Sequence, residues 1–348
     1  MSLEFDLQFP RRDFLLDIQG EFDDQTIGIF GPSGAGKTSF FSLLTGLETP
    51  EKGRIVLGGR VLTDTSKGLF VPVHKRRIGV VFQEKLLFPH LTIRENILFG
   101  ERYALKKNIG LDEVAELLGL GSLLDSMPYE ASGGEQQRTT IARALLTSPD
   151  MLLLDEPFNA MDNSLRATIL PYLRNLRDRL NIPFLVISHD LPDIQRLTNR
   201  IYFMEQGRCA GFGNSLDFYG DRVTRDSGFV NSFRLSDPQQ TAPGLFSCAV
   251  EGNPELRLTV PKAPADTFSL VVSPRAVALS RKRVEGLSVR NQIRGTISRI
   301  IQTETHILCI IDAGVRIASQ VTVPAARELE LKEGSEVYCL IKALSFRS

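Results

Sequence analysis

The stretch GPSGAGKT, from Gly31 to Thr38, constrains the fold more than any other part of this chain. It fits G-x-x-x-x-G-K-[ST], in which glycines let successive backbone N–H groups point at phosphate oxygens. An apolar run at residues 26–30 precedes it and a helical pattern at 39–44 follows, so an anion is expected where a helix begins after a strand. The predicted phosphate-binding loop consists of Gly31, Pro32, Ser33, Gly34, Ala35, Gly36, Lys37, Thr38 and Ser39.

Composition excludes several classes of partner. Lys+Arg 41 balance Asp+Glu 41, so no net field directs this 348-residue chain to nucleic acid or acidic lipid. The four cysteines show no C-x-x-C spacing, which fits free thiols in a reducing compartment. We find neither a secretion signal at the N-terminus nor an apolar run of the ~18 residues that span a bilayer. We therefore expect a soluble, cytoplasmic chain that meets a membrane only through a partner.

Apolar runs alternate with helical patterns over the first 230 residues, which predicts an α/β fold with a largely parallel sheet. Expected helices cover 39–44, 111–118 and 131–146. Expected strands cover 3–9, 14–18, 26–30, 53–57, 60–62, 78–82, 151–154 and 184–187.

Past residue 230 the pattern changes. Residues 236–244 (SDPQQTAPG) are polar and rich in turn formers, as linkers are. β-type runs at 269–272, 292–301, 306–311, 315–323 and 336–344, with a short helix at 325–329, predict a small OB-like β-barrel. The predicted division is an α/β domain at 1–230, a linker and the start of a β domain at 231–286, and the barrel at 287–348.

A second glycine-rich motif, Ser132-Gly133-Gly134 before a helix, makes another anion cradle. The phosphate-binding loop alone leaves kinases, GTPases and many ATPases open. With the second motif, residues 1–230 resemble the ATP-binding-cassette (ABC) ATPases, whose signature reads LSGGQ. In that family two cassettes pair head to tail, and each signature caps ATP on its partner's loop. The resemblance implies ATP and Mg²⁺ as cofactors and a homodimer, and it adds Ser132, Gly133, Gly134 and Glu135 to the expected nucleotide site.

The resemblance also assigns roles residue by residue. Gln83 looks like the glutamine that senses Mg²⁺ and faces the membrane partner, and Asp155 like the aspartate that orients the Mg²⁺ shell. Glu156 is similar in place to the general base, and His189 to the histidine that contacts the γ-phosphate. Asp162, in NAMD, resembles the aspartate of the D-loop, the segment that follows the general base. Phosphoryl transfer to water then depends on positioning and charge neutralisation.

Together with Lys37, the expected catalytic set is Glu156, His189, Gln83 and Asp155, and the expected Mg²⁺ ligands are Thr38, Gln83 and Asp155.

Other residues depart from the family pattern or have two possible roles. Ala131 and Glu135 depart from the Leu and Gln usual in the signature. Phe9 either stacks on adenine or belongs to the core or a hairpin, and Lys85, Arg76 and Arg77 are expected to be solvated charges.

A cassette followed by a β-barrel resembles importer ATPases, and residues 52–68 and 88–100 resemble the ATPase subunit of molybdate importers. Residues 288–298 and 331–343 are similar to the molybdate/tungstate-binding (Mop) domain. The resemblance implies ATP hydrolysis that energises molybdate or tungstate uptake through a separate integral membrane permease, with a periplasmic or extracellular anion-binding protein and without nucleic acid. The chain is then peripheral, at the cytoplasmic face of the cell membrane.

Tetrahedral dianions are held by hydroxyls, amides and a few cations, which Ser288, Arg290, Asn291 and Lys342 can supply to a regulatory molybdate or tungstate. The same residues also fit ordinary strand ends of a structural barrel. Alternatives are therefore an ATPase of a sulfate, iron or sugar importer, a storage or sensing protein with a vestigial cassette, and an OB-like nucleic-acid module, which the balanced charge disfavours.

Overall fold

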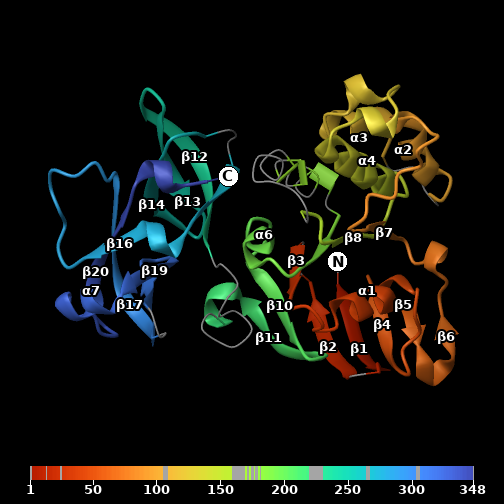
Figure 1. Ribbon diagram of the computed structural model, residues 1–348, viewed down its shortest axis with the longest axis horizontal. Coiled ribbons are helices and arrows are strands. Elements are labelled where there is room, and N and C mark those ends of the chain that lie inside the picture. The colour runs from red at the N-terminus through yellow and green to blue at the C-terminus, as the bar shows by residue number, and fades with distance from the viewer. Residues whose placement is uncertain are drawn as a thin grey trace. The chain divides into compact units, whose positions relative to one another are not determined.

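The computed structural model describes residues 2–12, 14–23, 26–104, 109–158, 169–170, 172–173, 176, 179–180, 182–218, 230–263, 267–302 and 306–347. The chain separates into two compact units, Met1–Asn214 and Ser215–Ser348 (Figure 1). An α/β unit with a phosphate-binding loop is followed by an all-β unit, which confirms the predicted fold class. No described helix is long and apolar enough to cross a bilayer.

An 11-stranded sheet organises the first unit, in the order β6-β5-β4-β1-β2-β11-β10-β3-β9-β8-β7. Its strands are β1 (Leu3–Pro10), β2 (Leu15–Phe22), β3 (Thr26–Phe30), β4 (Lys52–Leu57), β5 (Arg60–Asp64), β6 (Leu69–Phe70), β7 (Ile78–Val81), β8 (Met151–Asp155), β9 (Phe184–Ser188), β10 (Arg200–Glu205) and β11 (Arg208–Asn214). β10, β3, β9, β8 and β7 pair in parallel, but the pairs from β6 to β2 are antiparallel. The parallel part of the expected sheet is thus the half from β10 to β7, whereas in the other half short connections such as Gly58-Gly59 allow only antiparallel pairing.

The described helices of this unit are α1 (Lys37–Thr45), α2 (Ile93–Glu101), α3 (Leu111–Leu117), α4 (Gly133–Leu145) and α6 (Leu191–Gln195). The predicted helices at 39–44, 111–118 and 131–146 are confirmed as α1, α3 and α4. In Figure 1, α2, α3 and α4 lie together on one side of the unit. α2 and α4 approach closely, since a Cβ on Gly100 would lie 2.0 Å from the carbonyl oxygen of Arg143.

The central strands β3 and β9 are buried along their whole length, and β8 along all but its last residue. Strands covered on both faces read as continuous apolar runs, which explains why their positions could be predicted. Because β3, β8 and β9 are parallel, their carboxyl ends meet at one edge of the sheet. The residues that follow them, among them Gly31, Glu156 and His189, gather there.

Arg76 is fully buried, so its assignment as a solvated charge is wrong. Its Nη1 donates to the carbonyl oxygens of Leu43 and Leu44, both at 2.8 Å, in the last turn of α1. Nη2 donates to Thr63 Oγ1 at 2.9 Å and Nε to the Val71 carbonyl at 2.9 Å. Burial lowers the pKa of Arg76 to about 10. The last carbonyls of a helix lack partners within it, and this guanidinium supplies them.

The second unit contains a 4-stranded sheet, β14-β13-β12-β15, and a 5-stranded sheet, β16-β20-β17-β18-β19, which bury one common core. The elements are β12 (Asn231–Ala242), β13 (Leu245–Val250), β14 (Asn253–Val260), β15 (Thr267–Val272), β16 (Val277–Ser280), β17 (Asn291–Gln302), β18 (His306–Asp312), β19 (Arg316–Thr322), α7 (Val323–Glu328) and β20 (Glu336–Ile341). The linker expected at 236–244 is wrong, because most of it belongs to β12. Beyond Leu235 the side chains of β12 are at least partly exposed and its register is irregular, so a polar stretch with Pro238 fits a strand.

Hydrogen bonds of polar side chains complete the second unit. The Ser319 hydroxyl of β19 donates to the Val277 carbonyl at 2.6 Å, which joins the two edge strands of the 5-stranded sheet. The amide of Asn231 bridges the sheets, since Nδ2 donates to the Ala318 carbonyl at 2.9 Å and Oδ1 accepts from Ala318 N at 2.7 Å. The 5-stranded sheet is thereby closed on itself and attached to its neighbour.

Candidate active site

The loop after β3 has the shape that the glycine pattern predicts. A Cβ on Gly31 would lie 2.5 Å from the Met204 carbonyl oxygen, so only glycine fits there. Gly36 precedes α1 with φ of 101°, a left-handed conformation that favours glycine. The first N–H groups of α1 have no partners within the helix, and they open toward this loop.

Lys37 is folded back onto the loop. Its Nζ donates to the carbonyl oxygens of Gly31, at 2.7 Å, and Pro32, at 3.1 Å. Burial lowers the pKa of Lys37, while the charges of Glu156 and Asp155 oppose this shift. The lysine therefore lies between the loop and the acidic groups at the ends of the neighbouring strands.

Glu156 and His189 are in direct contact. Nδ1 of His189 lies 2.7 Å from Oε1 of Glu156, and the His189 backbone N donates to the same oxygen at 3.0 Å. Oε2 accepts from the Ser188 hydroxyl at 3.0 Å. Glu156 has φ of 46°, unusual for a non-glycine residue and typical of strained functional positions. We did not assign Ser188 a role from the sequence, although a hydroxyl beside a candidate histidine at a strand end is a recognisable signal.

Asp155 ends β8 opposite Ile187 of β9. Burial, and then the charge of Glu156, raise the pKa of Asp155 to about 6, although Lys37 acts in the opposite direction. Adjacent carboxylates in a partly buried site are an environment that a dication stabilises. The described residues contain no group of three His, Cys, Asp or Glu side chains able to hold a metal ion.

The other expected Mg²⁺ ligands are exposed. Thr38 lies in the first turn of α1, and Gln83 lies just beyond β7. A hydroxyl, an amide oxygen and the Asp155 carboxylate form an all-oxygen donor set, which Mg²⁺ prefers together with phosphate oxygens. The residues present therefore fit Mg²⁺ in a site that nucleotide phosphates complete.

Ser132 and Glu135 form a capping box at the start of α4. Glu135 N donates to Ser132 Oγ at 3.4 Å, and Ser132 N donates to Glu135 Oε2 at 2.7 Å. These hydrogen bonds with Ser132 are the main reason that the pKa of Glu135 is lowered. The glutamate at this unusual position therefore stabilises the helix start that presents Gly133 and Gly134.

α4 also holds the segment after Gln83. Nη1 of Arg143 donates to the Leu86 carbonyl at 2.9 Å, and its guanidinium lies 5.3 Å from the ring centroid of Phe88. Burial lowers the pKa of Arg143. One helix thus begins at the signature motif and supports the Gln83 loop near its other end.

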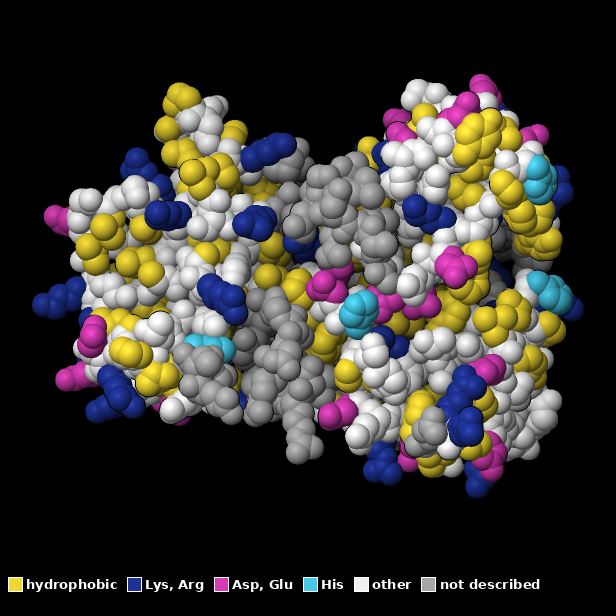
Figure 2. Space-filling model, in the orientation of Figure 1, with side chains coloured by type: hydrophobic (Ala, Val, Ile, Leu, Met, Phe, Trp, Pro, Cys, Tyr) yellow, Lys and Arg dark blue, Asp and Glu magenta, His cyan; other side chains and the backbone are white. Residues whose placement is uncertain are grey.

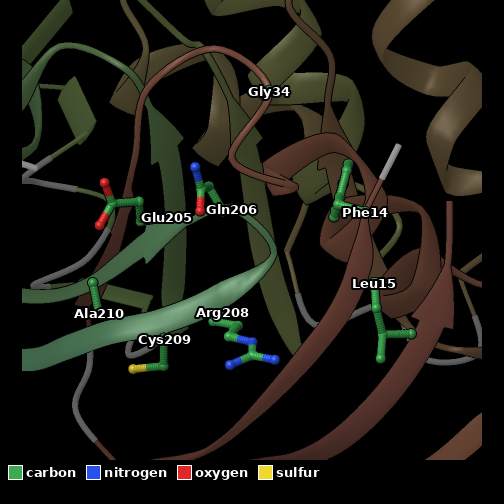
Figure 3. Close-up of a pocket in the computed structure, with 8 residues that line it drawn as sticks. All are labelled: Phe14, Leu15, Gly34, Glu205, Gln206, Arg208, Cys209 and Ala210. Carbon is green, nitrogen blue, oxygen red and sulfur yellow. The ribbon is translucent and has the colours of Figure 1, made fainter. Parts of the chain in front are cut away.

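A cavity of about 710 Å³ lies beside the phosphate-binding loop (Figure 3). It is lined by Phe14, Leu15, Gly34, Glu205, Gln206, Arg208, Cys209 and Ala210. Phe14 is the aromatic side chain named in this lining, and Phe9 is not part of it. Both rings pack against the core, and the Arg11 guanidinium lies 4.7 Å from the ring centroid of Phe9. The sequence drew attention to Phe9 and missed Phe14, although both flank the turn of one hairpin.

The residues expected to bind an oxyanion differ in their availability. Ser288, Arg290 and Lys342 are exposed, but Asn291 is buried. Asn291 Nδ2 donates to the carbonyls of Thr259, at 2.9 Å, and Ile341, at 3.2 Å, and Oδ1 accepts from Thr259 N at 2.6 Å. Asn291 therefore joins β14 to β17 and β20. Asp162 lies outside the described residues.

Comparisons with known proteins agree with this geometry. Residues 21–159 match the family model "ABC transporter", and residues 287–345 match "TOBE domain". The chain is 37% identical to the molybdenum import ATP-binding protein ModC of Rhizobium johnstonii, over 96% of each chain. It is 34% identical to ModC of Mesorhizobium japonicum, over 99% of this chain and 96% of the relative, and 36% identical to ModC 1 of Azotobacter vinelandii, over 91% and 90%.

Solved structures are similar to the first unit in fold. The structure of cbiO1 from Clostridium perfringens, part of an ABC transporter complex, gives a TM-score of 0.52 at 23% identity, over 63% of this chain and 91% of that one. The dimeric ABC transporter cassette MJ0796 gives 0.51 at 24% identity, over 62% and 98%.

Proposed function

This chain belongs to the ABC transporter family, among the molybdenum import ATP-binding proteins, and we propose that it hydrolyses ATP to energise molybdate uptake through separate membrane subunits. The observation that carries the proposal is the contact of Glu156 with His189 at the sheet edge where Asp155 and the phosphate-binding loop also lie. A phosphate-binding loop, the Lys37 ammonium and the hydrogen-bonded Glu156 carboxylate together fit the transfer of a phosphoryl group to water.

Each residue then has a defined task. Backbone N–H groups of residues 34–39 and the Lys37 ammonium hold the β- and γ-phosphates. Oε1 or Oε2 of Glu156 accepts the proton of the attacking water, while Ser188 and His189 fix the orientation of this carboxylate. Thr38, Gln83 and Asp155 would hold Mg²⁺, which would supply positive charge to the phosphate oxygens.

We assign the adenine ring to the cavity beside Gly34. Phe14 offers an aromatic face there, and 710 Å³ is within the usual range of about 300–1,000 Å³ for ligand pockets. Phe9 is a poorer platform, because the Arg11 guanidinium lies over its ring and Phe9 does not line this cavity. The nucleotide would then run from this cavity along the loop to Glu156.

A second copy of this chain completes the site in our proposal. Ser132 is exposed and Gly133 partly exposed at the start of α4, where the first helix N–H groups can bind an anion. They are assigned to the partner subunit's γ-phosphate, and Asp162 to the same dimer contact. ATP thus acts as the bridge between the two copies.

The permease is assigned to an apolar surface around α2. Phe88, Phe99 and Tyr103 form a continuous row, with ring centroids 4.6 Å and 5.8 Å apart, and Leu86 and Tyr103 are more than half exposed. Figure 2 shows hydrophobic side chains gathered over the region that α2 and α3 occupy in Figure 1. The Gln83 loop lies next to Leu86, and Gln83 is proposed to bind Mg²⁺ beside the nucleotide. Contact with the permease at this surface can therefore affect the nucleotide site. The chain would sit peripherally at the cytoplasmic face of the membrane, and an anion-binding protein outside would deliver the substrate.

The second unit is proposed to sense molybdate or tungstate. Ser288, Arg290 and Lys342 are exposed, as a site for a free anion requires, and Asn291 holds the strands between them in register. Anion binding at barrel–barrel contacts of the dimer would favour a cassette arrangement that cannot close, which inhibits hydrolysis.

Reconstitution tests the main proposal. The chain, purified with its permease in vesicles, should hydrolyse ATP and transport radiolabelled molybdate from the opposite side. A Lys37→Ala variant controls for contaminating ATPases. Transport of sulfate, iron or a sugar without molybdate would replace the substrate, and absence of ATP hydrolysis would exclude the proposed activity.

A further inference from the structure

The turn between β10 and β11 presents a strained residue to the cavity beside the phosphate-binding loop. Gln206 and Gly207 have φ of 48° and 77°. Two-residue hairpin turns with both residues left-handed prefer Asn-Gly, Asp-Gly or Gly-Gly, so glutamine is poorly suited to the first position. Such an outlier beside a ligand cavity points to a function of the side chain rather than of the turn.

The backbone of this turn is fixed against the loop. Gly207 N donates to the Ala35 carbonyl at 3.0 Å, and Asp17 N donates to the Gly207 carbonyl at 2.7 Å. Gly207 also packs closely, since a Cβ there would lie 2.5 Å from the Leu15 carbonyl oxygen. The root of the Gln206 side chain is therefore held at a constant place relative to bound phosphates.

The side chain itself is unengaged. Among the described residues, no group hydrogen-bonds the Gln206 amide, and the residue is exposed. Figure 3 shows this amide extending toward the loop that carries Gly34, whereas the Arg208 guanidinium points away from it. Glu205 extends away from Phe14 in the same view.

An adenine stacked on Phe14 places a polar ring edge in this cavity. A glutamine amide matches adenine well, because its oxygen accepts from the 6-amino group while its NH₂ donates to the adjacent ring nitrogen. We propose that Gln206 hydrogen-bonds the 6-amino group of adenine and so makes the site selective for the base of ATP. The proposal rests on the proposed function, since it presumes nucleotide at the phosphate-binding loop.

The Gln206→Asn variant separates the two roles of this residue. Asparagine suits the left-handed position better, so the melting temperature should hold or rise, but its amide is one methylene shorter. Equilibrium titration of the full-length chain, in EDTA to prevent hydrolysis, compares ATP with purine riboside triphosphate, which lacks only the 6-amino group. The parent should bind ATP about five-fold more tightly than the analogue, the value of one hydrogen bond, and the variant should bind both equally.

A Gln19→Asn change, at an exposed glutamine of β2 outside this cavity, serves as control and should keep the five-fold ratio. The inference is overturned if the Gln206→Asn variant still binds ATP about five-fold more tightly than the analogue. An equal loss of affinity for the two nucleotides leaves this ratio unchanged and overturns the inference as well. A parent that binds both nucleotides equally and still hydrolyses ATP defeats only this inference. A parent that binds neither nucleotide, in EDTA or with Mg²⁺, defeats the proposed function.

Discussion

His189 Nδ1 lies 2.7 Å from Oε1 of Glu156, while the backbone N of the same histidine donates to that oxygen at 3.0 Å. With Ser188 on the other oxygen, the hydrogen bonds of this carboxylate within the described part of the chain all come from residues 188 and 189, at the end of β9. The proposed base and the proposed γ-phosphate sensor therefore move as one group. Any shift of His189 toward a phosphate changes the position of the base at the same time.

Replacing Glu156 with Gln should remove the proton acceptor while keeping the size of the side chain. We expect hydrolysis to fall at least ~100-fold, with ATP affinity preserved. ATP should then hold two copies together, as an ATP-dependent dimer in size-exclusion chromatography. Ser188→Ala, which removes one orienting hydrogen bond, should cost only about five-fold. Parent-like hydrolysis by the Gln variant would show that Glu156 is not the base.

Ser132→Arg should block the trans site. The change places bulk and charge against the partner's nucleotide without touching its own phosphate-binding loop, so ATP binding by the monomer should persist while hydrolysis falls more than ~10-fold. Glu135→Gln is the matched control, because either residue completes a capping box, and its melting temperature should stay close to the parent's. Loss of ATP binding by the Ser132→Arg monomer would contradict action across a dimer.

The raised pKa of Asp155 predicts a pH-dependent stability. Its pKa is about 6 in the folded chain against an ordinary 3.8, so the folded state favours the protonated form. The resulting stabilisation is complete below pH 3.8 and is lost as the pH rises through 6. Without Mg²⁺, Asp155→Asn should therefore melt above the parent at pH 7.5, and the gap should shrink at pH 4.5. Thermal scans in EDTA measure this, and a gap that is constant with pH would disprove the assignment.

Arg76 should be worth more to stability than any exposed cation. Arg76→Met removes four hydrogen bonds, among them the one to the carbonyl of buried Leu44, which should cost about 2–4 kcal/mol of unfolding free energy. Arg54, about half exposed with ion-pair distances of 3.9 Å, is the control, and Arg54→Ala should change stability by less than about 0.5 kcal/mol. Urea unfolding of both variants decides, and equal losses would contradict a special role for Arg76.

Molybdate inside vesicles should inhibit ATP hydrolysis by the assembled transporter. Lys342→Ala should weaken this inhibition by roughly ten-fold in concentration, in keeping with ~1–3 kcal/mol of coupling. Lys332→Ala, an exposed lysine of the same unit, should leave it unchanged. Asn291→Ala is unsuitable, because its amide joins three strands. A flat response of the parent to molybdate and tungstate would leave the second unit a structural role.

Motifs with obligatory local geometry could be predicted from the sequence. The turn before α1 needs Gly31 and Gly36, and apolar strands flanked by helices must be buried. The central sheet, and the edge of it where Glu156 and His189 lie, could therefore be predicted from the sequence. The burial of Arg76 could not be predicted, because the Leu43 and Leu44 carbonyls that it binds are distant in the chain and carry no sequence signal. The linker predicted at the polar end of β12 is wrong for a related reason. An exposed strand is held in place by hydrogen bonds to the neighbouring strands, here β13 and β15, and its own residues give little sign of them.

Lys37 Nζ, bonded to the Gly31 and Pro32 carbonyls, uses hydrogen-bonding capacity that a bound phosphate would also require. An arriving triphosphate must exchange these contacts for its own, so the apparent dissociation constant equals the intrinsic one divided by the fraction of loops whose lysine is released. Substitutions that weaken the self-contact would tighten binding without adding any contact to the nucleotide.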